Sequence, residues 1–208
     1  FYYCCISKEF FFGSIMSLAL LFPGEGSQFI GMGSDFSLRF TVANQLFSDL
    51  DQILDRPLTE IMFDGNIDDL TLTTNSQPAI MAVSSAILES ISSENLINFD
   101  SVKAVAGHSL GEYSALYAAK SISFSSSIQL LEVRSRAMQE SMPVGTGGMA
   151  AIIGKSMLEV EDLLDSIKDY GQISIANDNA DGQIVVSGEM SAINHLCDNS
   201  KELGVKRA

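Results

Sequence analysis

The chain has 208 residues, of which 46% are hydrophobic and 18% are charged, and its formal net charge is −14. This composition excludes a disordered chain and allows one sizeable core, or a core with a small subdomain. The acidity makes nucleic acid a poor partner, and an anionic ligand would need a local cationic pocket.

The N-terminal segment differs from the rest of the chain. Residues 1–15 are apolar but interrupted by charges, without a basic leader, so a signal peptide or membrane span is disfavoured. We expect them to be an extension outside the fold, which starts at Met16. Cys4, Cys5 and Cys197 show neither disulfide nor zinc spacing, which favours a reducing, cytoplasmic setting.

The first two-thirds of the chain alternates strand-like and helix-like segments. Short apolar runs predict buried strands at 18–22 and 102–106. Apolar residues at helical spacing predict helices at 35–55, from Pro78 onward with Asn75 or Ser76 as N-cap, at 110–119, and at 126–142 with Ser123 or Ser125 as cap. This alternation predicts a parallel α/β sheet.

The pattern changes after a flexible joint at 143–148, which contains Pro143 and three glycines. The predicted elements are a strand at 149–153, a helix at 157–170, strands at 172–176 and 183–186, a helix at 189–203 and a strand opening at Val205. This β-α-β-β-α-β order is typical of a ferredoxin-like unit.

The sharpest motif is the segment 107–111, which reads Gly-His-Ser-Leu-Gly between a predicted strand and a predicted helix. Flanking glycines permit a tight strand-to-helix turn that lifts the Ser109 hydroxyl out of the fold as a nucleophile. The N–H of Leu110, at the start of the helix, is placed to stabilise an oxyanion. The alternative is turn chemistry without a catalytic role.

The segment 22–28 reads Phe-Pro-Gly-Glu-Gly-Ser-Gln and follows the first strand. It lacks the Gly-Lys-Ser/Thr ending of a P-loop, and Phe29 stands where a dinucleotide motif needs its third glycine, so a nucleotide site is disfavoured. The segment is either a loop that needs positive φ angles or a backbone that offers a second oxyanion donor.

Arg134 is predicted to lie on a buried helix stripe, whereas Arg136 faces Glu132 and Glu140 as an ordinary exposed ion-pair residue. The neighbours of Arg134 three and four residues away are apolar: Leu130, Leu131, Ala137 and Met138. A buried guanidinium needs an anion and suits bidentate binding of a carboxylate. That carboxylate belongs either to a substrate or to an internal Asp or Glu.

The two histidines, His108 and His195, favour structural roles over that of a general base. The residues alone therefore indicate a nucleophile without an evident base, which an activated serine normally requires.

Several segments together resemble malonyl-CoA:acyl-carrier-protein transacylases of fatty-acid synthesis, in order and spacing from Leu18 to Ala208. They are 22–28, 77–79, 107–115, Arg134 with Met138 and Gln139, 147–154, and 177–188 with Asn177 and Asn179. The resemblance implies an α/β fold, with an α/β-hydrolase-like large subdomain at 16–143 and an inserted ferredoxin-like subdomain at 144–208.

The resemblance also implies a ping-pong reaction in which malonyl passes from coenzyme A to Ser109 and then to the phosphopantetheine thiol of acyl carrier protein. Arg134 would pair with the malonyl carboxylate, and the backbone N–H groups of Leu110 and Glu25 would form the oxyanion hole. The expected substrate-binding set further contains Gln77, His108 and Asn177. We expect no metal, no resident cofactor, no nucleic-acid or membrane partner, and a cytoplasmic monomer.

Two departures from the family stand out. Glu25 replaces the usual glutamine, and its carboxylate would disfavour an oxyanion unless it points away. The family's catalytic histidine lies in a Ser-x-His segment downstream of the ferredoxin-like unit, without a counterpart in this sequence. We therefore expect weak or no activity and marginal stability from these 208 residues, taken as a C-terminally incomplete chain. A non-catalytic module binding coenzyme A or acyl carrier protein, and a serine hydrolase, stay open as alternatives.

Overall fold

The computed structural model describes residues 17–143 and 145–208, so the prediction about residues 1–15 lies outside the described residues. The chain divides into two compact units, one ending at Ala137 and the other spanning Met138–Ala208. Among the described helices, none has the length and apolar character that a membrane crossing requires.

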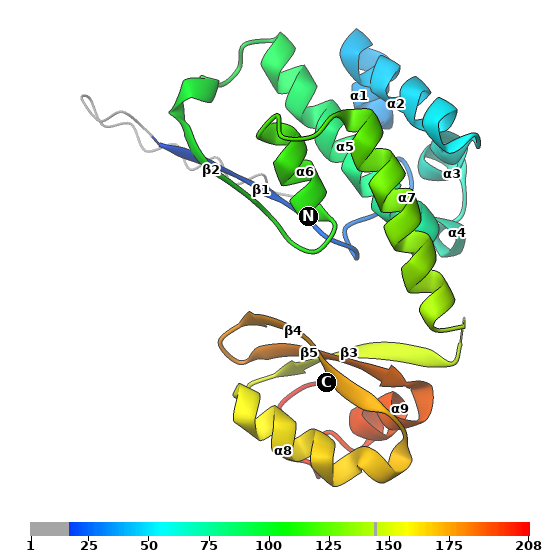
Figure 1. Ribbon diagram of the computed structural model, residues 1–208, viewed down its shortest axis with the longest axis vertical. Coiled ribbons are helices and arrows are strands. Elements are labelled where there is room, and N and C mark those ends of the chain that lie inside the picture. Colours follow the sequence, from blue (N-terminus) through cyan, green and yellow to red (C-terminus); the bar gives the residue numbers. More distant parts are fainter. Residues whose placement is uncertain (1–16, 144) are drawn as a thin grey trace. The chain divides into compact units, whose positions relative to one another are not determined.

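The first unit joins two parallel strands to a group of helices (Figure 1). The strands are β1 (Leu18–Phe22) and β2 (Val102–Gly107). The helices are α1 (Ser34–Arg39), α2 (Thr41–Leu54), α3 (Leu58–Asp64), α4 (Ile67–Thr71), α5 (Thr73–Ser93), the short 3-10 helix η1 (Phe99–Ser101), α6 (Gly111–Ala118) and α7 (Phe124–Ser141), which continues past the boundary between the units.

The strand pair is parallel, as predicted, and its register runs from Leu18 opposite Val102 to Phe22 opposite Gly107. The expectation that both strands are buried is wrong. α6 packs against both strands, but Leu21 is 77% exposed. A strand covered by helix on one face alternates between sheltered and exposed side chains, whereas full burial needs cover on both faces.

The helix predicted at 35–55 is divided at Phe40, whose backbone is extended with φ −123° and ψ 118°. Two helices, α1 and α2, therefore stand in place of one. The apolar spacing correctly predicted helical structure, but the prediction of a single continuous helix is wrong. The cap predicted at Ser123 is confirmed, because its Oγ accepts a hydrogen bond from the N–H of Ser126 at 3.0 Å.

α5 begins at Thr73 and contains Pro78 in its interior, so the predicted start at 76–78 is wrong. A proline inside a helix cannot donate to the carbonyl four residues earlier, here that of Thr74. The guanidinium of Arg56 compensates, because its Nη2 donates to the Thr74 carbonyl oxygen at 2.7 Å. A side chain from another element thus satisfies the acceptor that Pro78 leaves open.

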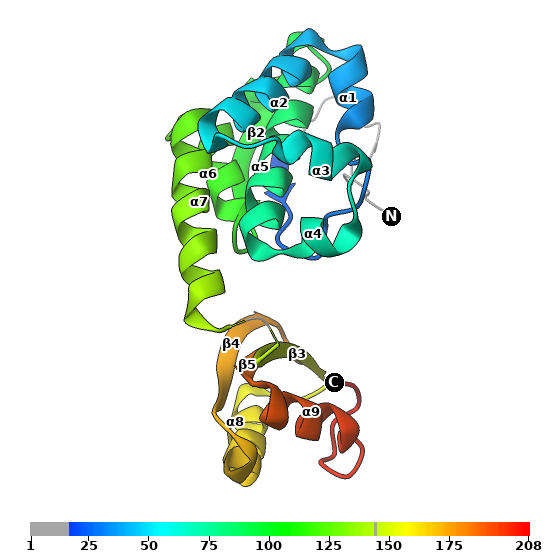
Figure 2. The same cartoon turned by 90° about the vertical axis from the view of Figure 1, so that its right-hand side faces the viewer.

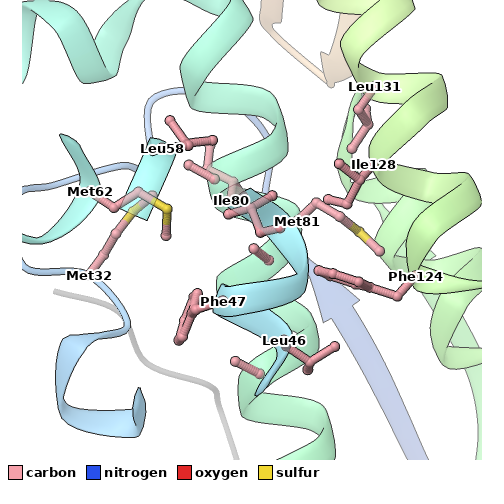
Figure 3. Packing of buried hydrophobic residues seen from close by; sticks show 14 of the residues in the cluster. Met32, Leu46, Phe47, Leu58, Met62, Ile80, Met81, Phe124, Ile128 and Leu131 are labelled. Carbon is pink, nitrogen blue, oxygen red and sulfur yellow. The ribbon is translucent and has the colours of Figure 1, made fainter. Parts of the chain in front are cut away.

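The core of the first unit gathers around α5, which packs against α2, α3, α4 and α6 (Figures 1 and 2). Figure 3 shows Ile80 and Met81 of α5 among side chains from α2, α3 and α7. The labelled members are Met32, Leu46, Phe47, Leu58, Met62, Ile80, Met81, Phe124, Ile128 and Leu131. This core fixes the helices that approach the ends of β1 and β2.

The second unit contains β3 (Gly147–Ile153), α8 (Met157–Ile167), the 3-10 helix η2 (Lys168–Tyr170), β4 (Ile173–Ala180), β5 (Gln183–Glu189) and α9 (Met190–Asp198). The strands form an antiparallel sheet in the order β3-β5-β4, and both α-helices lie on one of its faces (Figures 1 and 2). α9 ends before the predicted residue 203, and the strand expected from Val205 is reduced to a bridge between Arg207 and Ile153.

Candidate active site

The site forms where β1 and β2 end. Phe22 lies opposite Gly107, and parallel strands place their carboxyl ends at one edge, so the loops that follow both strands leave the sheet together. The N–H of His108 extends this pairing by donating to the Phe22 carbonyl at 3.0 Å. The loop that carries Glu25 is thereby held beside the turn that carries Ser109.

Ser109 occupies a strained turn between β2 and α6. Its φ is +55°, in the left-handed region that a residue with a side chain rarely adopts, and such strain is concentrated at functional sites. A Cβ on Gly107 would come within 1.9 Å of the Gly111 carbonyl carbon, and one on Gly111 within 2.5 Å of the Phe22 oxygen. Both glycines are therefore required for the tight turn that the sequence predicted.

The backbone N–H groups of Leu110 and Glu25 lie at this edge and have no hydrogen-bond acceptor among the described residues. Leu110 immediately precedes α6, and its side chain is fully buried, which fixes its backbone. Amides at a helix start carry partial positive charge and favour a negative oxygen. The two amides predicted as oxyanion donors are thus available for an external acceptor.

Arg134 extends from α7 to the side chain of Ser109. Its Nη2 donates to Ser109 Oγ at 3.0 Å, and its Nη1 donates to Gln77 Oε1 at 2.5 Å. The predicted buried stripe is only partly correct, since Leu131 is fully buried but Leu130 is 49% exposed. Arg134 is half-buried at the margin of the core, where its stem is packed and its guanidinium meets the site.

Arg134 has no carboxylate partner among the described residues, and both of its hydrogen-bond acceptors are neutral. Two other arginines, Arg56 and Arg136, differ from Arg134 because each of them pairs with a carboxylate. Arg136 pairs with Glu132 at 2.7 Å, as predicted, and Glu132 also receives Arg56 at 3.3 Å. The half-buried charge of Arg134 is therefore available to an external anion.

The carboxylate of Glu25 turns toward the start of α5. Its Oε1 accepts from Ser76 Oγ at 2.8 Å and its Oε2 accepts from Gln77 Nε2 at 3.4 Å. Ser76 and Gln77 are both fully buried. Sequence reasoning missed Ser76, which it treated as a helix cap. The available signal was the run of polar residues at 73–77, which occupies the first turns of α5 and is followed by apolar residues.

The histidines and Asn177 lie in different places. His108 is exposed directly before Ser109, and a Cβ on Gly24 would lie 2.7 Å from its Nδ1, so the loop needs glycine there. His195 belongs to α9 of the second unit, where it stacks on Tyr170 with ring centroids 3.5 Å apart. Asn177 lies half-buried on β4 of the same unit, opposite Val185.

The described residues contain no group of three or more His, Cys, Asp or Glu side chains that could hold a metal ion. Cys197 is a free thiol on α9.

Comparison with known proteins identifies the family of this chain. Residues 19–207 match the model of the acyl transferase domain. The chain belongs to the acyl transferase domain family. The α/β arrangement of this acyl transferase domain, with a glycine-flanked serine after a parallel strand, agrees with that assignment.

Curated relatives of this acyl transferase domain include the malonyl CoA-acyl carrier protein transacylases of Bacillus subtilis and Staphylococcus aureus. The Bacillus protein is 40% identical over 192 residues, which cover 92% of this chain and 59% of the relative. The Staphylococcus protein (strain MSSA476) is 37% identical over 190 residues, which cover 91% of this chain and 60% of the relative. The chain thus spans less than two thirds of the length of these relatives.

Solved structures that are similar to this chain also include malonyltransferases. An acyl-carrier-protein S-malonyltransferase from Bartonella henselae superposes with a TM-score of 0.84 at 45% identity, covering 92% of this chain and 61% of that one. A type II PKS acyl-carrier protein in complex with its malonyl-transacylase matches with a TM-score of 0.82 at 36% identity, with coverage of 92% and 61%. The acyl transferase domain therefore has the α/β fold of known malonyltransferases.

Proposed function

We propose that this chain is part of an acyl-carrier-protein S-malonyltransferase, which moves malonyl from malonyl-CoA to acyl carrier protein through a malonyl ester of Ser109. The observation that carries the proposal is the position of Arg134. Its guanidinium lies 3.0 Å from Ser109 Oγ and has only neutral partners among the described residues. The names of the relatives support the same reaction.

The short distance between guanidinium and nucleophile suits malonyl in particular. One methylene group separates the carboxylate of malonyl from its thioester carbonyl. A carboxylate paired with Arg134 therefore brings the thioester carbon close to Ser109 Oγ. A longer diacid would carry its thioester past the serine, and an acetyl group would leave the guanidinium unpaired.

In the first half-reaction, Ser109 Oγ attacks the thioester carbon and its proton passes to a base. The carbonyl oxygen becomes an oxyanion, which the amides of Leu110 and Glu25 stabilise. Collapse of this intermediate breaks the carbon–sulfur bond, and coenzyme A leaves as its thiol after taking up the proton. The product is malonyl esterified to Ser109.

In the second half-reaction, the phosphopantetheine thiol of acyl carrier protein attacks the ester carbon through the same oxyanion hole. The proton of this thiol passes to the base and from there to the Ser109 oxygen as the carbon–oxygen bond breaks, and malonyl leaves as a thioester of the carrier. Attack and release by chemically similar thiols make the reaction readily reversible, which suits a transferase.

The proton acceptor for Ser109 is a group other than its hydrogen-bond partner. Arg134 donates to Ser109 Oγ and cannot accept a proton. Its donation occupies a lone pair of the oxygen and leaves the hydroxyl hydrogen free to point at a base. The role of Arg134 is therefore binding and orientation, and the general base is a separate residue.

The same proposal covers the finer fold assignment. The turn between β2 and α6 supports an α/β-hydrolase-like large subdomain at 16–143, and the order β3-β5-β4 with two helices on one face supports a ferredoxin-like subdomain at 144–208. Gln77, His108 and Asn177 complete the proposed substrate-binding set. We also propose a cytoplasmic monomer without a resident cofactor and without a membrane partner. Nucleic acid is left out of the proposed partners because the net charge of −14 repels a phosphate backbone.

The proposal is tested with the full-length protein that contains these 208 residues, by incubating it with malonyl-CoA and measuring the mass of the peptide that contains Ser109. We expect a gain of one malonyl group on that peptide, and its discharge when phosphopantetheinylated acyl carrier protein is added. The Ser109→Ala variant serves as the control and should stay unmodified. A protein that folds but never acquires the adduct would rule the proposal out.

The same experiment separates a transferase from a serine hydrolase. Free malonate and malonyl carrier protein are both quantified after the adduct has formed. A transferase delivers most of the malonyl to the carrier, whereas a hydrolase releases malonate at the same rate with or without the carrier.

A further inference from the structure

A continuous series of hydrogen bonds joins Glu25 to the nucleophile. Gln77 donates from Nε2 to Glu25 Oε2 at 3.4 Å and accepts at Oε1 from Arg134 at 2.5 Å. Arg134 then donates to Ser109 Oγ at 3.0 Å. The four residues come from the loop after β1, from α5, from α7 and from the turn after β2, so the series crosses the whole site.

The hydrogen-bonding chemistry of Glu25 and Arg134 determines which kind of side chain can stand between them. A carboxylate only accepts hydrogen bonds and a guanidinium only donates them, whereas the amide of Gln77 has one end of each kind. Gln77 can satisfy both neighbours in a single orientation, with its nitrogen toward Glu25 and its oxygen toward Arg134. An acceptor at position 25 thus keeps the Gln77 oxygen pointed at the guanidinium.

Burial adds to this constraint. Gln77 and Ser76 are fully buried, whereas Glu25 is exposed at the surface. Ser76 donates to Oε1 of Glu25 at 2.8 Å, so each carboxylate oxygen receives a donor from α5. A carboxylate held at both oxygens offers Gln77 a fixed acceptor, which favours the orientation with its Nε2 toward Glu25.

We propose that Glu25 is a positioning residue, which acts through Gln77 to aim Arg134 at the carboxylate of the acyl group and so strengthens the preference for malonyl over uncharged acyl groups. This inference rests on the proposed function. It concerns the side chain of Glu25 and is independent of the oxyanion role proposed for its backbone N–H.

A direct electrostatic effect of Glu25 would have the opposite sign. Its negative charge repels the malonyl carboxylate, so removing the charge would improve malonyl binding if repulsion dominated. Positioning through Gln77 predicts that removing the acceptor weakens malonyl binding. The sign of the change therefore decides between the two effects.

The test compares Glu25→Ala and Glu25→Gln with the unchanged protein, by measuring kcat/KM for acylation of Ser109 by malonyl-CoA and by acetyl-CoA. We expect Glu25→Ala to lower the malonyl-to-acetyl ratio about fivefold to tenfold, mainly through a higher KM for malonyl-CoA. The conservative variant Glu25→Gln should keep the malonyl-to-acetyl ratio within about twofold of that of the unchanged protein, because its amide oxygen can still accept from Gln77.

A double variant shows whether the effect passes through Gln77. In a Gln77→Ala background, Glu25→Ala should cause no further loss, since residues that act in series are not additive. The Ser76→Ala variant should shift the ratio in the same direction by a smaller factor, because it loosens the carboxylate without removing it.

The inference is overturned if the malonyl-to-acetyl ratio of kcat/KM stays constant or rises in Glu25→Ala. It is also overturned if the effects of Glu25→Ala and Gln77→Ala on this ratio are fully additive. Failure of the proposed function would look different, because the unchanged protein would then form no malonyl adduct on Ser109 at all.

Discussion

At the scale of single residues, the geometry around Arg134 predicts which acyl group is used. Its guanidinium can pair with a carboxylate by two parallel hydrogen bonds, each of them charge-assisted. We expect Arg134→Ala to lower kcat/KM for malonyl-CoA about tenfold to a hundredfold and to raise that for acetyl-CoA, as measured by acylation of Ser109.

Arg134→Lys is the matched control for this prediction. It keeps the positive charge but replaces the planar fork with a point donor, so malonyl transfer should fall to an intermediate value. If Arg134→Ala leaves the preference between malonyl and acetyl unchanged, Arg134 does not select the acyl group.

The residues of the site differ in how well the sequence predicted them. The turn around Ser109 was predictable because its requirement is local: a strand, two glycines and a helix start adjoin the serine along the chain. The partner of the Glu25 carboxylate was not, since Ser76 lies 51 residues away. That contact depends on how α5 packs beside the end of β1, and no local pattern records such packing.

At the scale of secondary-structure elements, Arg56 joins two helices that carry the site, α5 and α7. It donates to the Thr74 carbonyl and to the Asn75 side chain at the start of α5, and it pairs with Glu132 on α7. Arg56→Ala would leave the Thr74 carbonyl without a donor, because Pro78 cannot supply one. We expect unfolding in urea to show a loss of about 1–3 kcal/mol in the free energy of unfolding.

Arg136→Ala is a matched control, because Arg136 pairs with the same Glu132 but its side chain is 62% exposed. Exposed ion pairs contribute about 0–1 kcal/mol, so this variant should stay close to the unchanged protein. Equal losses in both variants would mean that the Arg56 contacts to α5 add nothing beyond the ion pair.

The boundaries of the elements were the least predictable feature of the fold. Polar residues before Pro78 are typical of a helix cap, yet α5 starts at Thr73 because Arg56 can satisfy the carbonyl that the proline leaves open. The division at Phe40 was not predictable either, since apolar spacing continues across the break and gives no sign of the extended residue.

At the scale of the whole molecule, the change of pattern after residue 148 reflects two separate cores. The buried cluster of the first unit runs from Met32 to Leu131, and that of the second from Ala150 to Val205. Neither cluster takes a residue from the other unit. The order of strands and helices in each unit followed from the spacing of apolar residues, which depends only on local periodicity.

Two separate cores predict that damage to one leaves the other intact. Met81 and Ile184 are both buried, one in each cluster. Replacing either by alanine should cost about 2–5 kcal/mol in the stability of its own unit. In native-state hydrogen exchange, Met81→Ala should speed exchange of the α2 and α5 amides while the β3 and β5 amides keep their protection, and Ile184→Ala should do the reverse. If either variant accelerates exchange equally in both units, the two cores unfold as one cooperative structure, and the connection after α7 transmits stability between them.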